Sequence, residues 1–565
     1  MNSRFKRVLA RQTALAAGLL LLAGCVAPDN NATVTNSTDK AADTTSPDKR
    51  AQETDAVRLA KQATFGPTVD VVNRILNLGV SGWLDEQFAA TGSTYADIAA
   101  NKVSATYCGT VNDPNCYRHN FSREPVAMRF YSDAVSQPDQ LRQRVALALS
   151  ELIVASATKT ARASAIASFN QLFLDNAFGN YRTLLLAVTM HGYMGNFLDM
   201  GNSSKTAPNE NYAREMLQLF TMGPNKLNMD GTLVTDATGG AVPNYTPDDI
   251  KNIARALTGW TYDFFSNVHD YTTIDFAAPM VAAPSAYYTG VKTFLGTTVP
   301  AGASQMDSVT AAVDAAFNNS STAPYVSKIL IQQLVTSNPS PAYVGRIAAV
   351  FANNGNNVRG DLKAVVRAIL TDSEARGGAR TGAKDGKVKE PILLMTSLAR
   401  VTGMTTDGVP FMNRDGDFGQ PMFEAASVFN YYPPDYPVAK SATLVSPVSK
   451  LLTTGTILLR HNLVWQWTMD AVNPRGEFGA ASWITGSVGS SMDWSSWEAF
   501  GTDTDGMIDR IDLLLLNRTI TDAQKTALRN AANAITNSSP SLQARLRAQV
   551  MLYIVGSSPL FQVDR

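Results

Sequence analysis

Hydrophobic residues recur at helical spacing along most of this chain, and the pattern is clearest in residues 208–220. At 100° per residue, one face of a helix over this stretch carries Tyr212, Ala213, Met216, Leu217, Leu219 and Phe220. The opposite face carries Asn211, Arg214, Glu215 and Gln218. We therefore expect a central amphipathic helix that buries its apolar face and presents a polar face dense in ionisable groups.

The residues that open this helix favour its formation. Asn209 stands where an N-cap side chain accepts a backbone hydrogen bond, and the Glu210 carboxylate suits the positive end of the helix dipole. Glu210 also precedes Arg214 by four residues, which is the spacing of a helical ion pair.

The same spacing predicts helices through the rest of the chain. Thr246 is followed by a proline and two acids, and Thr521 begins a capping box that Gln524 completes. Gly79 is predicted to end one helix shortly before another begins. The expected helices cover 55–63, 68–78, a stretch from 81, 124–157 with a break at 137–138, 169–178, 181–190, 250–257, 306–317, 323–336, 341–353, 359–372, 389–402 and 447–469, with three more at the C-terminal end.

Residues 260–299, 403–446 and 473–500 lack this spacing. Residues 271–276 alternate weakly between polar and apolar, so we expect an ordered loop or a small hairpin there. The sequence has no fixed-period repeat, no strand–helix alternation and no glycine-rich phosphate loop. It therefore predicts an all-α body over 55–565, with a division into two lobes, about 55–300 and 301–565.

The N-terminus has the pattern of an export signal. Four basic residues, Arg4, Lys6, Arg7 and Arg11, precede an apolar run over 14–23 that is too short to span a bilayer. The run ends in Leu22-Ala23-Gly24-Cys25, which resembles the bacterial lipobox and implies that 1–24 is a signal peptide and Cys25 carries lipid. The alternative is an ordinary signal peptide with an incidental cysteine.

The residues after Cys25 predict how the protein is placed in the envelope. Val26, by analogy with known sorting, favours the outer membrane. Residues 25–54 contain almost no large apolar side chain, so they are predicted to be a disordered tether between the lipid and the body. We expect a lipid-anchored protein of the bacterial cell envelope.

Composition limits the classes of partner. The chain has 565 residues, 45% of them hydrophobic, which is enough for a large core. Lys+Arg and Asp+Glu each number 48, so no net charge attracts nucleic acid, and we exclude it as a partner. Only 17% of residues are charged, against about 25% in typical domains. That low fraction is compatible with a secreted protein.

Cys108 and Cys116 flank an Asn-Asp-Pro-Asn turn. In an oxidising envelope compartment, this arrangement predicts a disulfide that closes a short loop. A metal site is the alternative, but these two thiols and His119 supply too few ligands for one.

Eight motifs, in order across the mature chain, match one known family. They include Pro208-Asn-Glu-Asn-Tyr-Ala-Arg-Glu215 and Ala254-Arg-Ala-Leu-Thr-Gly-Trp260, with the others at 58–67, 82–88, 197–199, 292–296, 372–376 and 389–391. On these motifs the chain resembles the bacterial domain-of-unknown-function 1800 family. The resemblance implies a large, mainly helical, exported protein. It also implies, from the usual gene neighbours, an exported partner with a fold like alkaline phosphatase, but it implies no reaction.

The chain departs from the family pattern in two places. Many members have an acid and a histidine where this chain has Gln218 and Phe220, and a Gly-Trp-Pro-like segment where it has residues 430–435. Chemistry that needs those family side chains is therefore not expected here.

The candidate site joins the polar face of the central helix to the segment before it. His191, Asp199 and Asn202 are followed by a loop of a few residues, so they are predicted to converge with Asn211 and Glu215. The carboxylates can act as acid and base, or can bind a divalent cation with amide oxygens completing its shell. The alternative is a buried polar network, with Asn209 as a cap, Glu210 paired to Arg214, and Asn211 and Glu215 holding the adjoining loop.

Four further groups of residues have a functional and a structural interpretation. His269 and Asp270 lie in an irregular loop, where binding residues often occur, although a local turn is the alternative. Residues 413–417 look like part of a calcium loop but lack its closing acid, so we predict a turn. Two roles are open for Tyr431, Tyr432 and Tyr436. They can form an aromatic platform that binds a ligand, or they can pack onto the core. His461 has apolar neighbours and is predicted to be structural.

Two hypotheses follow from the sequence. The first is an envelope scaffold or binding protein that acts with an exported partner on a surface polysaccharide or peptide. The second is an envelope hydrolase or lyase that uses Asp199 and Glu215, with His191 nearby, on a carbohydrate or ester. Whether these side chains share a solvent-reachable cleft distinguishes the two.

Overall fold

A computed structural model describes residues 47–376, 382, 385–441, 443–469 and 477–565. The predicted signal peptide, Cys25 and most of the tether lie outside the described residues. Helix α2 (Pro47–Ala63) begins inside the predicted tether, so residues 47–54 are helical. No helix within the described ranges is long and apolar enough to cross a membrane.

The chain up to the first strands is built from helices, as predicted. Thr68 caps α3, and Gly79, with φ of 69°, interrupts that helix where the sequence predicted an end. The elements are α3 (Val69–Ala89), α4 (Ala96–Ala100), η1 (Tyr107–Gly109), α5 (Cys116–Asn120), α6 (Glu124–Ser136), α7 (Gln140–Leu152), α8 (Ala163–Asn176), α9 (Tyr181–Met190), α10 (Gly192–Phe197), α11 (Asn211–Glu215), η2 (Met216–Thr221) and α12 (Pro247–Ala256).

Helices resume after the strands and continue to the C-terminus. Thr521 forms the capping box that the sequence predicted, and Thr246, predicted as a cap before a proline and two acids, forms a capping box with Asp249. The elements are α13 (Gln305–Asn318), α14 (Thr322–Leu334), α15 (Pro341–Ala352), α16 (Leu362–Thr371), α17 (Ser373–Arg376), α18 (Pro391–Val401), α19 (Val409–Met412), η4 (Asp415–Phe418), η5 (Pro447–Leu451), α20 (Thr454–Thr468), α21 (Ser495–Glu498), α22 (Thr504–Ile511), η6 (Asp512–Leu516), α23 (Asp522–Asn533) and α24 (Pro540–Gly556).

The body is helix-rich rather than strictly all-α, because segments between its helices form short antiparallel strand pairs. The pairs are β1 (Trp260–Thr261) with β4 (Val281–Ala282), β2 (Asp263–Phe264) with β3 (Ile274–Asp275), β5 (Lys292–Phe294) with β6 (Thr297–Val299), β7 (Lys387–Val388) with β10 (Val563–Asp564), and β8 (Met404–Thr405) with β9 (Ser491–Met492). A short 3₁₀ turn, η3 (Pro284–Ala286), accompanies them. The expected loop or hairpin at 260–299 thus contains three such pairs.

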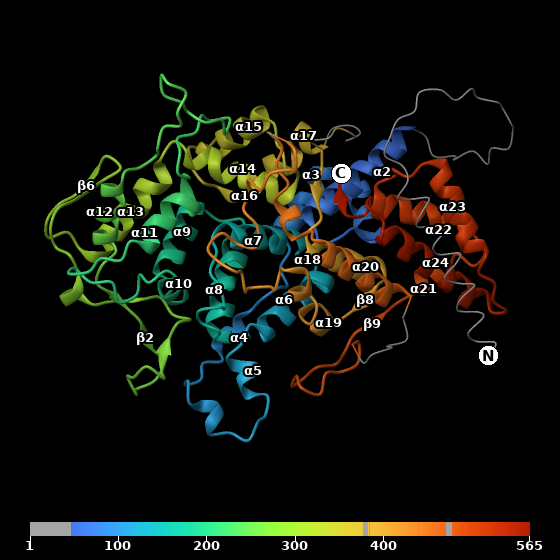
Figure 1. Cartoon of the computed structure of the whole chain (residues 1–565), viewed down its shortest axis with the longest axis horizontal. Coiled ribbons are helices and arrows are strands. Elements are labelled where there is room, and N and C mark those ends of the chain that lie inside the picture. The colour runs from blue at the N-terminus through green and yellow to red at the C-terminus, as the bar shows by residue number, and fades with distance from the viewer. Residues whose placement is uncertain (1–46, 377–381, 383–384, 442, 470–476) are drawn as a thin grey trace.

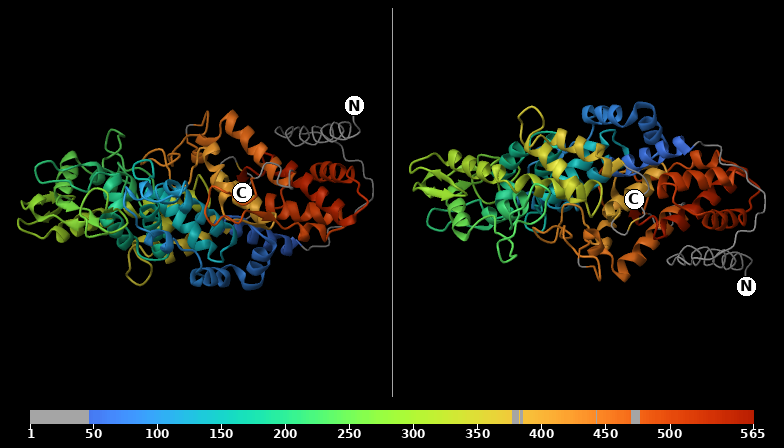
Figure 2. Two further views of the ribbon diagram at one scale, coloured as in Figure 1. Left: turned by 90° about the horizontal axis from the view of Figure 1, so that it is seen from below. Right: turned by 90° about the horizontal axis from the view of Figure 1, so that it is seen from above.

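One hydrophobic cluster runs through the body, from Ala56 to Phe561. It includes residues on both sides of position 300, so the two predicted lobes share a core. The body is elongated, with α22, α23 and α24 at one end and α12, α13 and the β5–β6 pair at the other (Figures 1 and 2). Helix α7 lies between these ends, and most of its residues are buried.

The central amphipathic helix is present, with one difference in form. It begins at Asn211 as α11 and continues from Met216 as the π-helical turn η2, in which the Thr221 hydroxyl donates to the Met216 carbonyl at 2.6 Å. Tyr212 and Phe220 are buried, as the apolar spacing predicted. The helix therefore has the expected burial, but its second half is wound more widely than an α-helix.

Candidate functional site

One of the predicted contacts between the polar face of the central helix and the segment before it is present. The Asn211 side-chain amide donates to Asp199 at 3.0 Å, and the Lys159 ammonium donates to the other oxygen of the same carboxylate. Asp199 is exposed, and its backbone lies in the left-handed region with φ of 58°. Asp199 and Asn211 are therefore brought together, but at the surface and with a lysine pairing the acid.

Glu215 is the least solvated acid on this face. Burial raises the pKa of its carboxyl, and the neighbouring Arg214 opposes that shift. Its Oε2 atom is buried and has no hydrogen-bond partner within the described part of the chain. Burial also raises the pKa values of Tyr245 and Tyr325, and the Glu215 charge adds to both shifts.

His191 has a structural environment. Its Nδ1 caps α10 by accepting the backbone N–H of Tyr193 at 3.2 Å, and its Nε2 lies 3.1 Å from the Ser168 hydroxyl. Burial lowers the pKa of the imidazole to about 3, so it is neutral in ordinary conditions. Among the described contacts, none joins it to Asp199 or Glu215.

The other residues of the predicted site make local contacts in loops and in the first turn of the helix. Asn202 accepts from the Thr261 hydroxyl at 2.7 Å, and Asn209 accepts from the backbone of Asn211 as a turn just before the helix rather than as its N-cap. The predicted ion pair of Glu210 with Arg214 is present at 3.0 Å.

His269 and Asp270 belong to the β2–β3 hairpin and not to the central helix. The His269 ring stacks on Phe264 with centroids 4.8 Å apart, and Asp270 accepts the backbone N–H of Thr272 at 2.8 Å. The alternative of a local turn therefore describes these residues.

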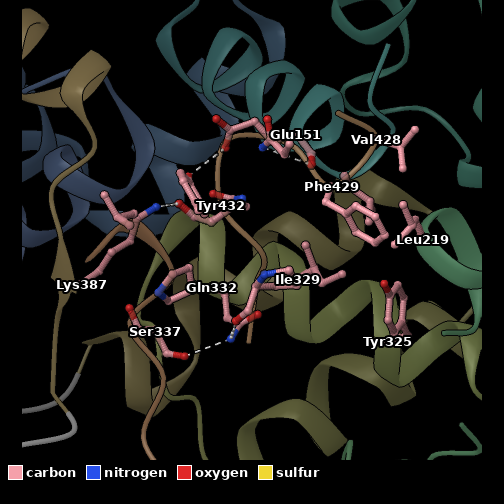
Figure 3. A pocket seen from close by; sticks show the side chains of 16 residues that line it. Glu151, Leu219, Tyr325, Ile329, Gln332, Ser337, Lys387, Val428, Phe429 and Tyr432 are labelled. Atoms are coloured by element: carbon pink, nitrogen blue, oxygen red, sulfur yellow. Dashed lines mark hydrogen bonds between the residues drawn. The ribbon is translucent and has the colours of Figure 1, made fainter. Parts of the chain in front are cut away.

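A pocket of about 60 Å³ lies between the centre of the core and the 430–448 loop (Figure 3). Glu151 from α7, Gln332 and Gln333 from α14, Lys387 from β7 and Tyr432 from the loop line its polar side. Its apolar side is lined by Leu152, Leu219, Ile329, Val428, Phe429 and Val448. Leu219 belongs to the central helix, so that helix reaches this pocket one turn after Glu215.

Two carboxylates are linked behind this pocket. The Gln420 side-chain amide donates to Glu151 at 3.1 Å and to Glu390 at 3.2 Å. The Tyr432 hydroxyl lies 3.4 Å from the second Glu151 oxygen, and the Lys387 ammonium donates to Glu390 at 2.7 Å. Glu390 is fully buried, whereas Glu151 lines the pocket.

The environments of the two acids push their pKa values apart. Burial, and then the Glu390 charge, raise the pKa of Glu151 to about 8. Burial alone would raise the pKa of Glu390 as well, but the positive charges of Lys387 and Arg144 outweigh it and lower that pKa. Near neutral pH the pocket therefore presents the protonated carboxyl of Glu151, with the ionised carboxylate of Glu390 buried behind it.

The sequence pattern pointed to Tyr432 but not to the acid pair. Tyr431 and Tyr432 pack onto the core, as one of the two interpretations predicted, and Tyr432 also lines the pocket. Glu151 lies within the helix predicted over 124–157, but no motif in the sequence singled it out. The described residues contain no group of three or more His, Cys, Asp and Glu side chains that could hold a metal ion.

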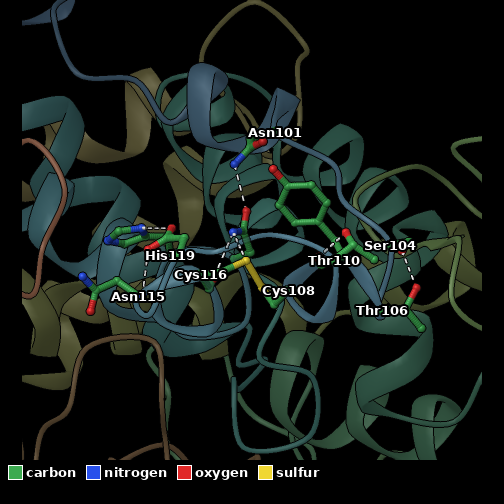
Figure 4. Close-up of a disulfide and its surroundings, with 11 residues drawn as sticks. Asn101, Ser104, Thr106, Cys108, Thr110, Asn115, Cys116 and His119 are labelled. Atoms are coloured by element: carbon green, nitrogen blue, oxygen red, sulfur yellow. Dashed lines mark hydrogen bonds and ion pairs between the residues drawn. A yellow bond between two sulfur atoms is a disulfide. The ribbon is translucent and has the colours of Figure 1, made fainter.

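The predicted disulfide joins Cys108 to Cys116, with their Cα atoms 5.5 Å apart (Figure 4). It closes the loop over 108–116 that leads into α5 at the edge of the body. His119, the third potential metal ligand, instead accepts the backbone N–H of Thr485 at 3.2 Å. The cysteines are therefore structural.

Fold and site together define a large helix-rich protein with a small mixed polar and apolar pocket at its centre. The family model described as "Protein of unknown function (DUF1800)" matches residues 58–563, which is nearly the whole chain. The chain belongs to that family. No curated protein and no solved structure matches it.

Proposed function

We propose that this is a lipid-anchored protein of the bacterial envelope that binds a neutral hydroxyl- or amide-bearing group of a surface polysaccharide or peptide in the Glu151 pocket. We propose further that it does so together with an exported partner of alkaline-phosphatase-like fold. The N-terminal sequence supports the anchor and the outer-membrane location, and the family resemblance supports the partner. The pocket supports the class of ligand.

The chemistry of the pocket lining carries this proposal. Gln332, Gln333 and Asn430 supply amide groups, and the protonated Glu151 is a neutral hydrogen-bond donor. The only charged side chain that lines it near neutral pH, Lys387, already donates to Glu390. A ligand that forms hydrogen bonds without carrying charge therefore suits the site, and the apolar wall packs against its carbon face.

Phe429 provides the test because it lines the pocket and is 52% exposed, so its loss leaves the core intact. Binding of neutral oligosaccharides and peptides from the envelope would be measured by calorimetry on the full-length chain. We expect Phe429→Ala to weaken binding about fivefold or more. Tyr271→Ala is the matched control, since Tyr271 is 77% exposed in the β2–β3 hairpin. Equal losses in both variants would contradict the proposal.

The partner is tested separately. The tagged lipoprotein would be purified from solubilised envelopes under several growth conditions and its companions identified by mass spectrometry. We expect the same exported protein each time. Failure to recover one under any condition would remove the partner from the proposal and leave ligand binding unaffected.

The pair of linked carboxylates favours a second function, hydrolysis of a glycosidic or ester bond. In place of Asp199, Glu215 and His191, the acid would be Glu151, whose proton passes to the leaving oxygen while water adds to the carbon and returns a proton to the carboxylate. Glu390 would act as a positioning residue, since its charge adds to the effect of burial in keeping Glu151 protonated. Glu151→Gln should then abolish product formation while ligand binding persists. Unchanged turnover would exclude this function.

A further inference from the structure

A second cavity, of about 400 Å³, opens between α20, the end of α24 and the C-terminal segment. Its walls are mostly apolar, with Leu452, Ile457, Ile554, Pro559 and Val563 among the lining residues. Its size falls in the range of about 300–1,000 Å³ that small-molecule sites occupy. It shares none of its lining residues with the Glu151 pocket.

One charged side chain lines this apolar cavity. Arg460 is 1% exposed, and its Nη1 donates to the Lys389 carbonyl at 3.1 Å and to the Gln562 side chain at 2.8 Å. Its Nε and Nη2 are buried and have no hydrogen-bond partner within the described ranges. A buried guanidinium with two nitrogens that donate no hydrogen bond lowers the stability of the fold unless an acceptor binds them.

The nearby acids are already engaged with lysines. Asp564 lies 3.1 Å from the Lys389 ammonium and 3.7 Å from that of Lys61. Glu390 pairs with Lys387 at 2.7 Å. This part of the core therefore has more positive than negative side chains, and the burial of Arg460 lowers its pKa to about 10 without making it neutral near pH 7.

The helix beside the cavity adds an uncharged surface. Ile457, Leu458, Leu459 and Trp465 are between 37% and 62% exposed, although all are large and apolar. The single charged residue of α20 is the buried Arg460. Ile457 is thus exposed at the surface and also lines the cavity, together with Arg460.

From these observations we infer that the cavity binds a single-chain amphiphile with an anionic head, a carboxylate or phosphate. The head pairs with the guanidinium of Arg460, which lines the cavity and whose planar fork of N–H groups matches two oxygens of such a group. The alkyl chain lies along the apolar walls towards Ile457. This site is independent of the proposed function.

Calorimetry on the full-length chain in phosphatidylcholine nanodiscs tests the inference, with empty nanodiscs as the blank. Dodecanoate and dodecyl phosphate supply the two anionic heads, and dodecanol supplies the same chain without charge. We expect both anions, or one of them, to bind at least tenfold more tightly than dodecanol. Equal affinity for all three would overturn the inference, because the guanidinium would then contribute nothing.

Variants locate the site. Arg460→Met should remove the preference for the anions. If that variant does not fold, Ile457→Asp decides, since Ile457 is partly exposed and lines the cavity, so its charge repels the head group. Leu458→Asp is the matched control on the same helix, outside the cavity lining. We expect a tenfold loss of dodecanoate affinity in Ile457→Asp and none in Leu458→Asp; equal effects would overturn the inference.

A further measurement distinguishes a free amphiphile from a lipid in a bilayer as the source of the ligand. Monomeric dodecanoate represents a free fatty acid, and phosphatidylglycerol vesicles represent lipid in a bilayer. Binding of the monomer supports the cavity. Binding to vesicles without binding of the monomer would overturn it in favour of adsorption of the α20 surface to a membrane.

Discussion

Arg123 and Asp415 form a two-pronged salt bridge across a sequence separation of 292 residues, with both nitrogen–oxygen distances at 2.8 Å. Asp415 is fully buried and also accepts the backbone N–H of Met422 at 2.9 Å. The segment that looks superficially like a calcium loop begins as a turn at 413–414, as predicted, and continues as the 3₁₀ helix η4, whose Asp415 pairs with an arginine. This pair ties the start of α6 to the loop before the Glu151 pocket.

Asp415→Ala is expected to lower the free energy of unfolding by about 3–5 kcal/mol, because it leaves the Arg123 guanidinium without its buried partner. Arg74→Ala is the comparison, since the Arg74–Glu86 pair is largely exposed and its loss should cost at most about 1 kcal/mol. Denaturant titration of both variants checks the difference. Similar midpoints would show that the buried pair contributes no more than a surface pair.

His191→Ala is expected to destabilise the protein by about 2–4 kcal/mol, because it removes a helix cap and buried ring packing against Phe169. His191→Asn, which keeps a cap acceptor, should recover about 1 kcal/mol. Ligand binding in the Glu151 pocket should be unchanged in both. A loss of binding in a folded variant would return His191 to the functional site.

The pH dependence of His191 has a defined sign. Its pKa is lowered in the folded protein, so its contribution to stability is present above pH 6.5 and is lost as pH falls towards 3. Thermal unfolding of His191→Asn should therefore be less sensitive to acid over that window than that of the wild type. Parallel curves would contradict the buried neutral imidazole.

Glu151→Gln is expected to flatten the pH dependence of stability between about pH 4.5 and pH 8. The pKa of Glu151 is raised to about 8, so its contribution is full below the unfolded value near 4.5 and is lost as pH rises through 8. Between pH 5 and 9 the wild type should lose about 1–3 kcal/mol more than the variant. Unfolding midpoints measured across that range check the difference, and identical slopes would exclude a protonated Glu151.

Replacing Cys108 and Cys116 with serine should loosen the α5 loop locally. In the chain-entropy model, a loop this short loses about 2–3 kcal/mol of stabilisation when it is opened. Hydrogen exchange of the α5 amides should accelerate roughly 30- to 150-fold, while the α7 amides in the core stay unchanged. Faster exchange in both helices would mean that the disulfide supports the whole body.

Much of the secondary structure was predictable because it depends on neighbours a few residues apart. The apolar spacing located the central helix. The cap, proline and acids at Thr246 and the capping box at Thr521 located two helix starts. The candidate site was predicted less well. Sequence proximity placed Asp199 beside Asn211, but the same argument grouped them with His191, whose ring faces Ser168 and Phe169.

The sequence by itself determined the helical periodicity, the helix starts, the short disulfide loop and the family motifs, because each depends on local spacing. Only the tertiary structure decided that Glu151, Glu390 and Gln420 meet behind one pocket. It likewise decided that Arg460 lines an apolar cavity and that two nitrogens of its guanidinium have no hydrogen-bond partner within the described residues. The physical reason is that burial and charge partners set the chemistry of these groups, and both come from segments far apart in the chain.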